Sequence, residues 1–195
     1  MKVSAALIMS SLVVHQAIFF VLFFCINQAI PSEAARSNGG LVAKTCKKIA
    51  ADDPAVDYAF CLTSLQSGKH SNTADLRGLG IIASNLARIN ATRSRRKAQN
   101  LKKKATDLYD KTRLADCEEL FQLAVSSLRD STRAFRGERY DDANINLSAA
   151  MTDAETCDDG FAEMEGHVSP LTKETRNLKG LCAVGLGITW LLTRR

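Results

Sequence analysis

The chain has 195 residues and a formal net charge of +5, with 26 Lys and Arg residues against 21 Asp and Glu. Roughly 160 residues remain once the amino-terminal segment described below is set apart, which is one domain's worth of chain and enough for a single hydrophobic core. A basic stretch described below would suit a nucleic-acid partner in a cytosolic protein, so the cellular compartment decides whether that class of partner is excluded.

The first 34 residues have the organisation of a cleaved secretion signal. A positive start precedes the nearly continuous apolar stretch 7–26, and a small-x-small cleavage pattern follows at Ser32 to Ala34. A transmembrane anchor is the alternative, because the stretch is long for a signal, but His15 and Gln16 interrupt it. We therefore expect a signal peptide over 1–34, a secreted product, no membrane partner after cleavage, and no nucleic-acid partner in that compartment.

Residues 41–193 are expected to form one all-α domain. Apolar residues recur there at spacings of three and four, and no alternating strand pattern of useful length appears. A short helical arm is followed by four long amphipathic helices, which predict a four-helix bundle. The first long helix starts near Thr73 and Asp75, and the last follows Pro170 with Thr172 as its cap. The predicted buried stripes are Leu76, Leu79, Ile82, Leu86 and Ile89; Leu114, Cys117, Phe121, Ala124, Leu128 and Phe135; Leu147, Ala150, Ala154, Cys157, Phe161 and Met164; and Leu178, Leu181, Gly185, Ile188 and Leu192.

The cysteines left after signal cleavage are Cys46, Cys61, Cys117, Cys157 and Cys182. In an antiparallel helical hairpin, equal distances from the turn mean equal heights along the axis, because both helices rise about 1.5 Å per residue. Cys117 and Cys157 each lie 20 residues from Gly137, on stripes that face each other, and Cys46 and Cys61 flank the turn at 52–54 almost evenly. We therefore predict the pairs Cys46–Cys61 and Cys117–Cys157. Cys182 is then a buried thiol, with an intermolecular crosslink as the alternative.

No constellation of residues in the chain indicates catalysis or metal binding. If Cys157 faces the core, its acidic neighbours point largely toward solvent, where they lack the burial or mutual repulsion that shifts the pKa of a catalytic pair. These neighbours are Asp153, Glu155, Asp158 and Asp159. No C-x-x-C motif is present, His70 and His167 lie far apart in sequence, and no nucleophile has an evident base. We therefore expect a protein that is not an enzyme and that has no metal or cofactor.

Five segments together resemble the plant invertase and pectin methylesterase inhibitors. They are TCKKIAADDPAVDYAFCLTSL, TADLRGLGIIASNLA, LADCEELFQLAV, YDDANINLSAAMTDAETCDDGF and VSPLTKETRNL. The resemblance covers essentially the whole chain after the signal and is strongest to members named as invertase inhibitors. It implies an up-down four-helix bundle with an N-terminal helical hairpin and two disulfides, in the same pairs as above. It also implies a secreted inhibitor of a carbohydrate enzyme in the cell wall, with the vacuole as a second destination.

The resemblance implies two different ways of binding a target enzyme. Invertase inhibitors of this family insert a Pro-Lys-Phe element, at the turn between the second and third long helices, into the substrate cleft. Here Arg139 and Tyr140 would stand for the Lys and Phe, but Glu138 replaces the proline and removes its fixed backbone angle. Pectin methylesterase inhibitors use the exposed bundle surface, and the Tyr140-Asp141 pattern is common among them. We therefore predict Arg139, Tyr140 and Asp141 as target-binding residues and favour pectin methylesterase over invertase.

A simpler interpretation of the turn remains open. Tyr140 would merely pack at the start of a helix, where Asp141 and Asp142 suit the positive end of the helix dipole.

A basic stretch between Asp75 and Asp107 contains no acid. Its nine cations are Arg77, Arg88, Arg93, Arg95, Arg96, Lys97, Lys102, Lys103 and Lys104. One interpretation is a solvated helix end whose cations suit the negative end of the helix dipole. The functional alternative is a patch that holds the protein on de-esterified pectin, a dense polyanion, through Arg93, Arg95, Arg96 and Lys97.

Two sequons predict N-linked glycans in a secreted chain, NAT at Asn90 and NLS at Asn146. A glycan at Asn90 would crowd the basic stretch, so these two interpretations compete.

A carrier of hydrophobic ligands is a different class of small, secreted, disulfide-bonded helical protein. It would need an internal apolar cavity, whereas the mixture of Ala, Leu and Phe on the stripes predicts closed packing. A storage or defence protein without an enzyme target is a further alternative.

Overall fold

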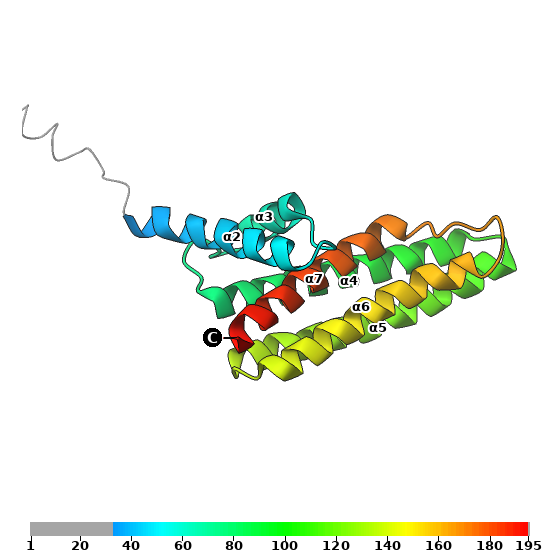
Figure 1. Ribbon diagram of the computed structural model, residues 1–195. Coiled ribbons are helices and arrows are strands. Elements are labelled where there is room, and N and C mark those ends of the chain that lie inside the picture. Colours follow the sequence, from blue (N-terminus) through cyan, green and yellow to red (C-terminus); the bar gives the residue numbers. More distant parts are fainter. Residues whose placement is uncertain (1–32, 195) are drawn as a thin grey trace, which may run out of the picture. The chain divides into compact units, whose positions relative to one another are not determined.

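The computed structural model describes residues 33–194. The predicted signal peptide over 1–34 therefore lies outside the described residues, except for its last two positions. The described helices are α2 (Glu33–Asp52), α3 (Tyr58–Ser67), α4 (Leu76–Lys104), α5 (Leu108–Arg136), α6 (Tyr140–Ala162) and α7 (Thr172–Thr193) (Figure 1). This part of the chain contains no strand, which confirms the all-α prediction. None of its helices combines the length and the hydropathy needed to cross a membrane.

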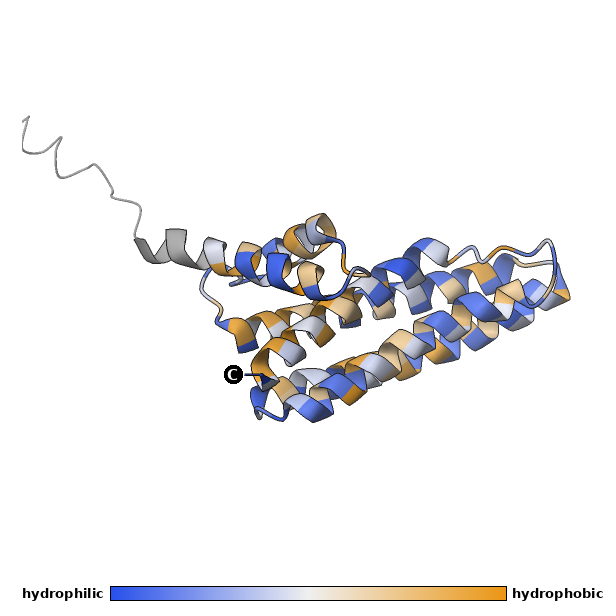
Figure 2. Cartoon of the chain, in the orientation of Figure 1, coloured by the Kyte–Doolittle hydropathy of each residue, from blue (hydrophilic) through white to orange (hydrophobic). Residues whose placement is uncertain are grey.

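Helices α4 to α7 form the bundle. Each packs against the next along the chain, and α4 also packs against α7, which closes a ring of four. The chain reverses direction at every connection, so the topology is up-down (Figure 1). The α4–α5 and α6–α7 connections lie at one end of the bundle and the α5–α6 turn lies at the other. Hydrophobic and hydrophilic residues alternate along each helix (Figure 2), and the buried interior contains Phe121, Phe135 and Phe161 as its largest side chains.

The α2–α3 hairpin packs on the bundle beside α7. The Cys46–Cys61 disulfide joins its two helices, with an S–S distance of 2.01 Å. Helix α2 comes close to α7 at Gly187, where a Cβ atom would lie 2.3 Å from Cγ2 of the buried Ile49. Only a residue without a side chain fits between the two helices at this point, so Gly187 sets how closely the hairpin approaches α7.

The predicted helix starts lie within two residues of the observed ones for α4 and α7, but the predicted caps, Thr73 and Thr172, are wrong. The carboxylate of Asp75 caps α4 by accepting a hydrogen bond from a backbone N–H at 2.7 Å, while Thr73 lies outside the helix. At α7 the cap position is occupied by Leu171, and Thr172 is the first helical residue. The Thr172 hydroxyl donates to the carbonyl of Ser169 at 2.9 Å, so it secures the preceding turn rather than the helix amides.

Two residues of the predicted stripes are exposed, and the rest are buried or packed against the core. Ile89 is 40% exposed and Met164 is 43% exposed. Met164 lies beyond the end of α6, which removes it from the helix face. Ile89 is exposed because α4 turns a different face inward, made of small residues that let its neighbours approach closely. That face contains Gly80, Ala83, Ser84, Ala87, Ala91, Ser94 and Ala98.

Candidate functional site

The α5–α6 turn, which contains the predicted target-binding residues, is fastened to the body of the bundle. Glu138 has a left-handed backbone, with φ of 57°. Its carboxylate pairs with the guanidinium of Arg77 at the start of α4, with 2.5 Å between Nη1 and Oε1. Because a proline ring holds φ near −65°, proline does not fit the backbone seen at Glu138. The backbone of this turn therefore differs from that of a turn with proline at position 138.

The three predicted target-binding residues differ in their exposure. Tyr140 is half-buried against the core, and its ring centroid lies 6.4 Å from that of the buried Phe135. Arg139 is exposed, with its Nε 3.3 Å from the carboxylate of Asp142. Asp141 is exposed in the first turn of α6, beside the positive end of the helix dipole. The structure thus places Tyr140 as a packing residue, and leaves Arg139 and Asp141 open to solvent.

A broader exposed surface runs along α5 and α6, and we call it the α5–α6 face. Over the Cys117–Cys157 disulfide, which has an S–S distance of 2.08 Å, this face consists of Arg113, Asp116, Glu119, Leu120, Leu123, Thr156, Gly160 and Glu163. We include in it the exposed Ile145, which lies nearer the α5–α6 turn on α6. A groove of about 320 Å³ lies over the disulfide. Leu123 is 50% exposed and Ile145 is 66% exposed. Sequence reasoning missed both, although large apolar residues on the outward side of a predicted helix are a recognisable signal.

The acids around Cys157 do not all face solvent, which corrects the sequence-based expectation. Glu155 and Asp159 are exposed, but Asp153 and Asp158 are half-buried. Asp158 accepts a hydrogen bond from the Thr175 hydroxyl at 2.6 Å, which ties α6 to α7. Burial raises the pKa of Asp153 to about 6. Asp158 does not contribute to this shift, so the two acids are not the coupled pair of carboxylates that acid–base catalysis uses.

Cys182 is the free cysteine of the described residues and lies buried in α7. Burial raises the pKa of its thiol to about 12, and the nearby carboxylate of Asp153 adds to this shift. The thiol therefore stays neutral and is a poor nucleophile at physiological pH.

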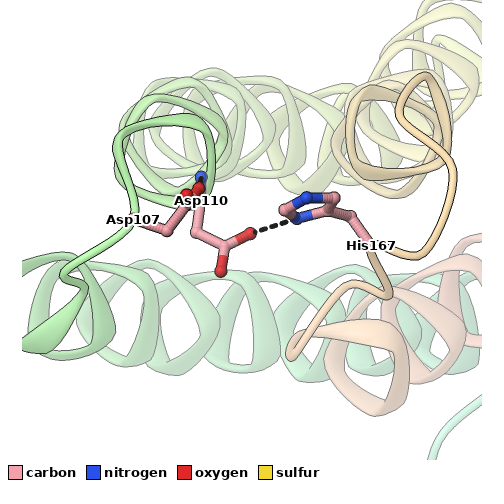
Figure 3. Close-up of side chains that lie close together, drawn as sticks. All are labelled: Asp107, Asp110 and His167. Atoms are coloured by element: carbon pink, nitrogen blue, oxygen red, sulfur yellow. Dashed lines mark hydrogen bonds and ion pairs between the residues drawn. The ribbon is translucent and has the colours of Figure 1, made fainter.

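A cluster that the sequence did not indicate joins the two connections at one end of the bundle (Figure 3). His167 lies in the α6–α7 connection, and its Nδ1 is 2.9 Å from Oδ1 of Asp110 in α5. Asp107 caps α5 by accepting a hydrogen bond from the Asp110 backbone N–H at 3.0 Å. One side-chain ligand atom of each residue lies within 4.8 Å of the others. Both carboxylates already have a structural partner, so the cluster is explained as a fastening between connections.

The four basic residues predicted to hold pectin do not form one exposed patch. Arg93 and Arg96 are exposed on the outer face of α4. Lys97 pairs with Glu174 of α7 at 2.8 Å. The Nε of Arg95 is buried, on the same side of α4 as Lys102, which pairs with Glu118 of α5 at 2.5 Å. Hydrogen bonds from Lys102 and Gln99 hold the pKa of Glu118 below its usual value, and the charge of Arg95 contributes.

Among the described residues, four exposed cations of α4 have no ion-pair partner: Arg93, Arg96, Lys103 and Lys104. Arg93, Arg96 and Lys103 follow one another along one outer stripe of the helix. Their spacings of three and seven keep them on one side of the helix. We call these residues the α4 outer stripe.

Both predicted glycosylation sites lie within helices. Asn90 is half-buried in α4, and its side-chain oxygen is 3.4 Å from the Ser94 hydroxyl. Asn146 lies in α6, and its side-chain amide donates to the carbonyl of Asp142 at 2.8 Å. Glycosylation at either position remains a prediction.

The sequence matches the plant invertase/pectin methylesterase inhibitor family over residues 40–188. It is 39% identical to a protein from Platanus acerifolia named "Putative invertase inhibitor", over 90% of this chain and 94% of that one. It is 31% identical to "Cell wall / vacuolar inhibitor of fructosidase 2" from Arabidopsis thaliana, over 88% of this chain and 94% of that one. It is 30% identical to "Pectinesterase inhibitor" from Actinidia deliciosa, over 88% and 89% of the two chains.

The fold is similar to that of a solved pectin methylesterase inhibitor from Arabidopsis. The crystal structure of its mutant form A aligns with a TM-score of 0.62 at 22% identity, over 75% of this chain and 93% of that one. The four-helix bundle, the hairpin and the match along most of the chain agree with one another, and the relatives are named as inhibitors of enzymes rather than as enzymes. The protein therefore belongs to the plant invertase/pectin methylesterase inhibitor family and is not itself an enzyme.

Proposed function

We propose that the protein is a secreted inhibitor of pectin methylesterase and binds the enzyme in a stoichiometric complex. In this proposal a signal peptide over 1–34 directs the chain to the cell wall, with the vacuole as the alternative, and residues 41–193 form the inhibitory domain. The observation that supports this target over invertase is the shape of the α5–α6 turn. A turn that inserts into a deep cleft needs a projecting anchor, whereas Tyr140 packs against Phe135.

The contacts around the turn oppose insertion. Glu138 is held by Arg77 and Arg139 by Asp142, so the turn would have to give up both ion pairs to reach into a cleft. Exposed ion pairs contribute little individually, but removing Tyr140 from the core would also expose apolar surface. The turn is therefore better suited to lie against a partner than to enter one.

The α5–α6 face supplies a surface of the kind that a broad contact requires. Leu123 and Ile145 are large apolar side chains exposed on two helices that the Cys117–Cys157 disulfide crosslinks. Apolar anchors on a rigid support bind without a large loss of conformational entropy. We infer that these two residues contact pectin methylesterase, and that Arg139 and Asp141 contribute at the rim.

Titration of a fixed amount of purified pectin methylesterase tests the proposal. Acid release should fall linearly and reach zero near one molecule of inhibitor per molecule of enzyme. The double variant Leu123→Asp/Ile145→Asp should weaken inhibition by a factor of about 100 or more, as loss of two interface anchors does. The control variant Leu108→Asp/Val168→Asp also changes two exposed apolar residues. Full inhibition by Leu123→Asp/Ile145→Asp would refute the assignment of this face.

Inhibition of an acid invertase is the second candidate function. The observation in its favour is the identity of about 40% to two Platanus proteins named "Putative invertase inhibitor". Against it stands the φ of Glu138, which excludes the backbone of a proline-bearing turn.

We also propose that de-esterified pectin is a second partner, held by cations of α4. Of the four residues singled out in the sequence, Arg93 and Arg96 are free to contact a polyanion, and Lys103 extends their row. Lys97 and Arg95 contribute less, because Lys97 pairs with Glu174 and Arg95 lies near Glu118.

A further inference from the structure

A groove lies between the end of α7, helix α2 and the start of α4. Its volume is about 290 Å³, at the lower end of the range for small-molecule sites. Its apolar lining consists of Leu41, Leu76, Trp190 and Leu191 together with Thr45, and its charged lining consists of Lys44, Lys48 and Arg194. No acidic residue lines it. A groove with an apolar floor and cations as its only charged groups is suited to a ligand with an apolar surface and negative charge.

The backbone places these cations with regular helical geometry. Lys44 and Lys48 are four residues apart on α2, and Trp190 and Arg194 are four residues apart along α7 and its cap, so each pair lies on one side of its element. Gly187 allows α2 to approach α7 closely enough for Lys48 to reach Trp190. The groove therefore follows from the packing of the hairpin on α7.

Trp190 holds two of the cations. The Arg194 guanidinium carbon lies 4.4 Å from the centroid of the indole ring, and the Lys48 ammonium nitrogen lies 5.8 Å from it. A cation–π contact stabilises a positive charge without using its N–H donors as a carboxylate partner would. Within the described part of the chain, Lys44, Lys48 and Arg194 form no ion pair. Their donors are thus positioned and available to an anion.

We propose that this groove binds a uronate oligosaccharide, with the sugar carboxylates on Lys44, Lys48 and Arg194 and the apolar faces of the sugar rings on the groove floor. Carboxylates accept charge-assisted hydrogen bonds from both kinds of cation. A sugar ring presents C–H groups to the Leu and Trp side chains, a match that a phosphate group alone does not offer. An acidic peptide has the charge, but its mobile side chains lose more conformational entropy on binding than a rigid ring does.

The biological meaning of this site rests on the proposed function. Hydrolysis of a methyl ester releases methanol and leaves a carboxylate on the sugar, so the product of pectin methylesterase is a chain of uronates. An inhibitor that binds this product would stay where the enzyme has already acted. The groove has no residue in common with the α5–α6 face or with the α4 outer stripe, so each surface can be tested alone.

The chain contains a single tryptophan, Trp190, which makes its fluorescence a direct probe of the groove. The purified protein is titrated with trigalacturonate, with its neutral methyl ester, and with triglutamate as an acidic peptide. We expect a saturable change in emission with trigalacturonate alone. The variant Lys48→Gln/Arg194→Gln should weaken binding by about tenfold for each cation removed, as loss of a charged hydrogen bond does.

The matched control is Arg129→Gln/Arg136→Gln, which removes the same charge from two exposed residues of α5 and should bind trigalacturonate as the wild type does. Unchanged melting temperatures establish that the variants are folded, and Lys44→Gln offers a third position in the groove. Equal weakening by the groove and control variants would overturn the proposal, because it would show general charge attraction. An equal response to triglutamate, or no saturable response, would also overturn it. None of these readouts uses pectin methylesterase, so they are independent of the proposed target.

Discussion

Two residues of the α5–α6 turn, Glu138 and Tyr140, carry most of the information about the target. The sequence indicated that Glu138 replaces a proline, and the structure adds that its φ of 57° lies outside the range of proline. The packing of Tyr140 on Phe135 supports the simpler interpretation of that tyrosine, which is packing at a helix start. The positions of these side chains depend on tertiary contacts with α4 and the core, which a local motif does not reveal.

Asp153 gives a prediction about pH at the level of one residue. Its pKa is about 6 in the folded protein and 3.8 without the influence of the fold, so the folded state binds more protons between these values. Stability should therefore fall as pH rises from about 4 to about 6. Asp153→Asn removes this effect and should melt at a higher temperature than the wild type above pH 6, with the two converging near pH 4. Melting temperatures measured across this pH range test the prediction, with Glu155→Gln, a change at an exposed acid, as the control. A constant difference in melting temperature between Asp153→Asn and the wild type at every pH would contradict it.

Cys182 gives a second prediction for a single side chain. Its thiol has a pKa of about 12, so almost none is ionised at pH 8. Iodoacetamide should leave Cys182 unmodified in the native protein and label it fully after denaturation, as peptide mapping would show. Rapid native labelling, or a Cys182-linked dimer on a non-reducing gel, would instead support the intermolecular crosslink.

At the scale of helices, the sequence predicted what depends on periodicity and missed what depends on residue size. The four bundle helices and the facing positions of Cys117 and Cys157 follow from spacing alone, and the structure contains that disulfide. The buried face of α4 was predicted correctly at Leu76 and Leu79 and misplaced at Ile89, because beyond Leu79 the core face is made of Gly, Ala and Ser, which hydropathy patterns underweight. The Asp110–His167 contact joins residues 57 positions apart and has no local signal.

The two disulfides should differ in their contribution to stability. Cys46–Cys61 closes a separation of 15 residues and Cys117–Cys157 one of 40. Longer loops lose more entropy when crosslinked, so replacing both cysteines of a pair by serine should cost about 3 kcal/mol for the first and about 4 kcal/mol for the second. Inhibition should fall more with Cys117→Ser/Cys157→Ser, which loosens the α5–α6 face. Chemical denaturation measures the two losses of stability. A larger loss for the Cys46–Cys61 pair than for the Cys117–Cys157 pair would contradict the prediction.

The α4 outer stripe gives a prediction about pectin. Arg93→Gln/Arg96→Gln/Lys103→Gln should reduce retention on immobilised polygalacturonate more than Arg95→Gln/Lys97→Gln/Lys102→Gln, which removes equal charge from residues already near Glu118 and Glu174. Retention of the wild type should decline with salt, since charges in 0.1 M salt are screened over about 10 Å. Equal retention of both triple variants would contradict pectin binding by the stripe and would support the interpretation of a solvated helix end.

At the scale of the whole molecule, the two proposals assign distinct surfaces of the bundle to distinct partners. In the first, the apolar side chains of the α5–α6 face contact an enzyme, and in the second, the cations of the groove beside Trp190 bind an acidic sugar. Similar sequences are named as invertase inhibitors and as pectinesterase inhibitors, so membership of the family does not determine the target. The choice between targets lies in the turn and in the exposed side chains.

The inhibition constants of the wild type and of Arg139→Ala/Tyr140→Ala, against purified pectin methylesterase and acid invertase, test the central claim most directly. We expect the wild type to inhibit pectin methylesterase but not invertase. The double variant should lose no more than about fivefold, provided that its melting temperature shows it to be folded, because the turn lies at the rim of the contact. The claim would be contradicted if the wild type inhibited invertase strongly and the double variant inhibited it about a thousandfold more weakly. A loss of that size is what removal of two interface anchors would cause.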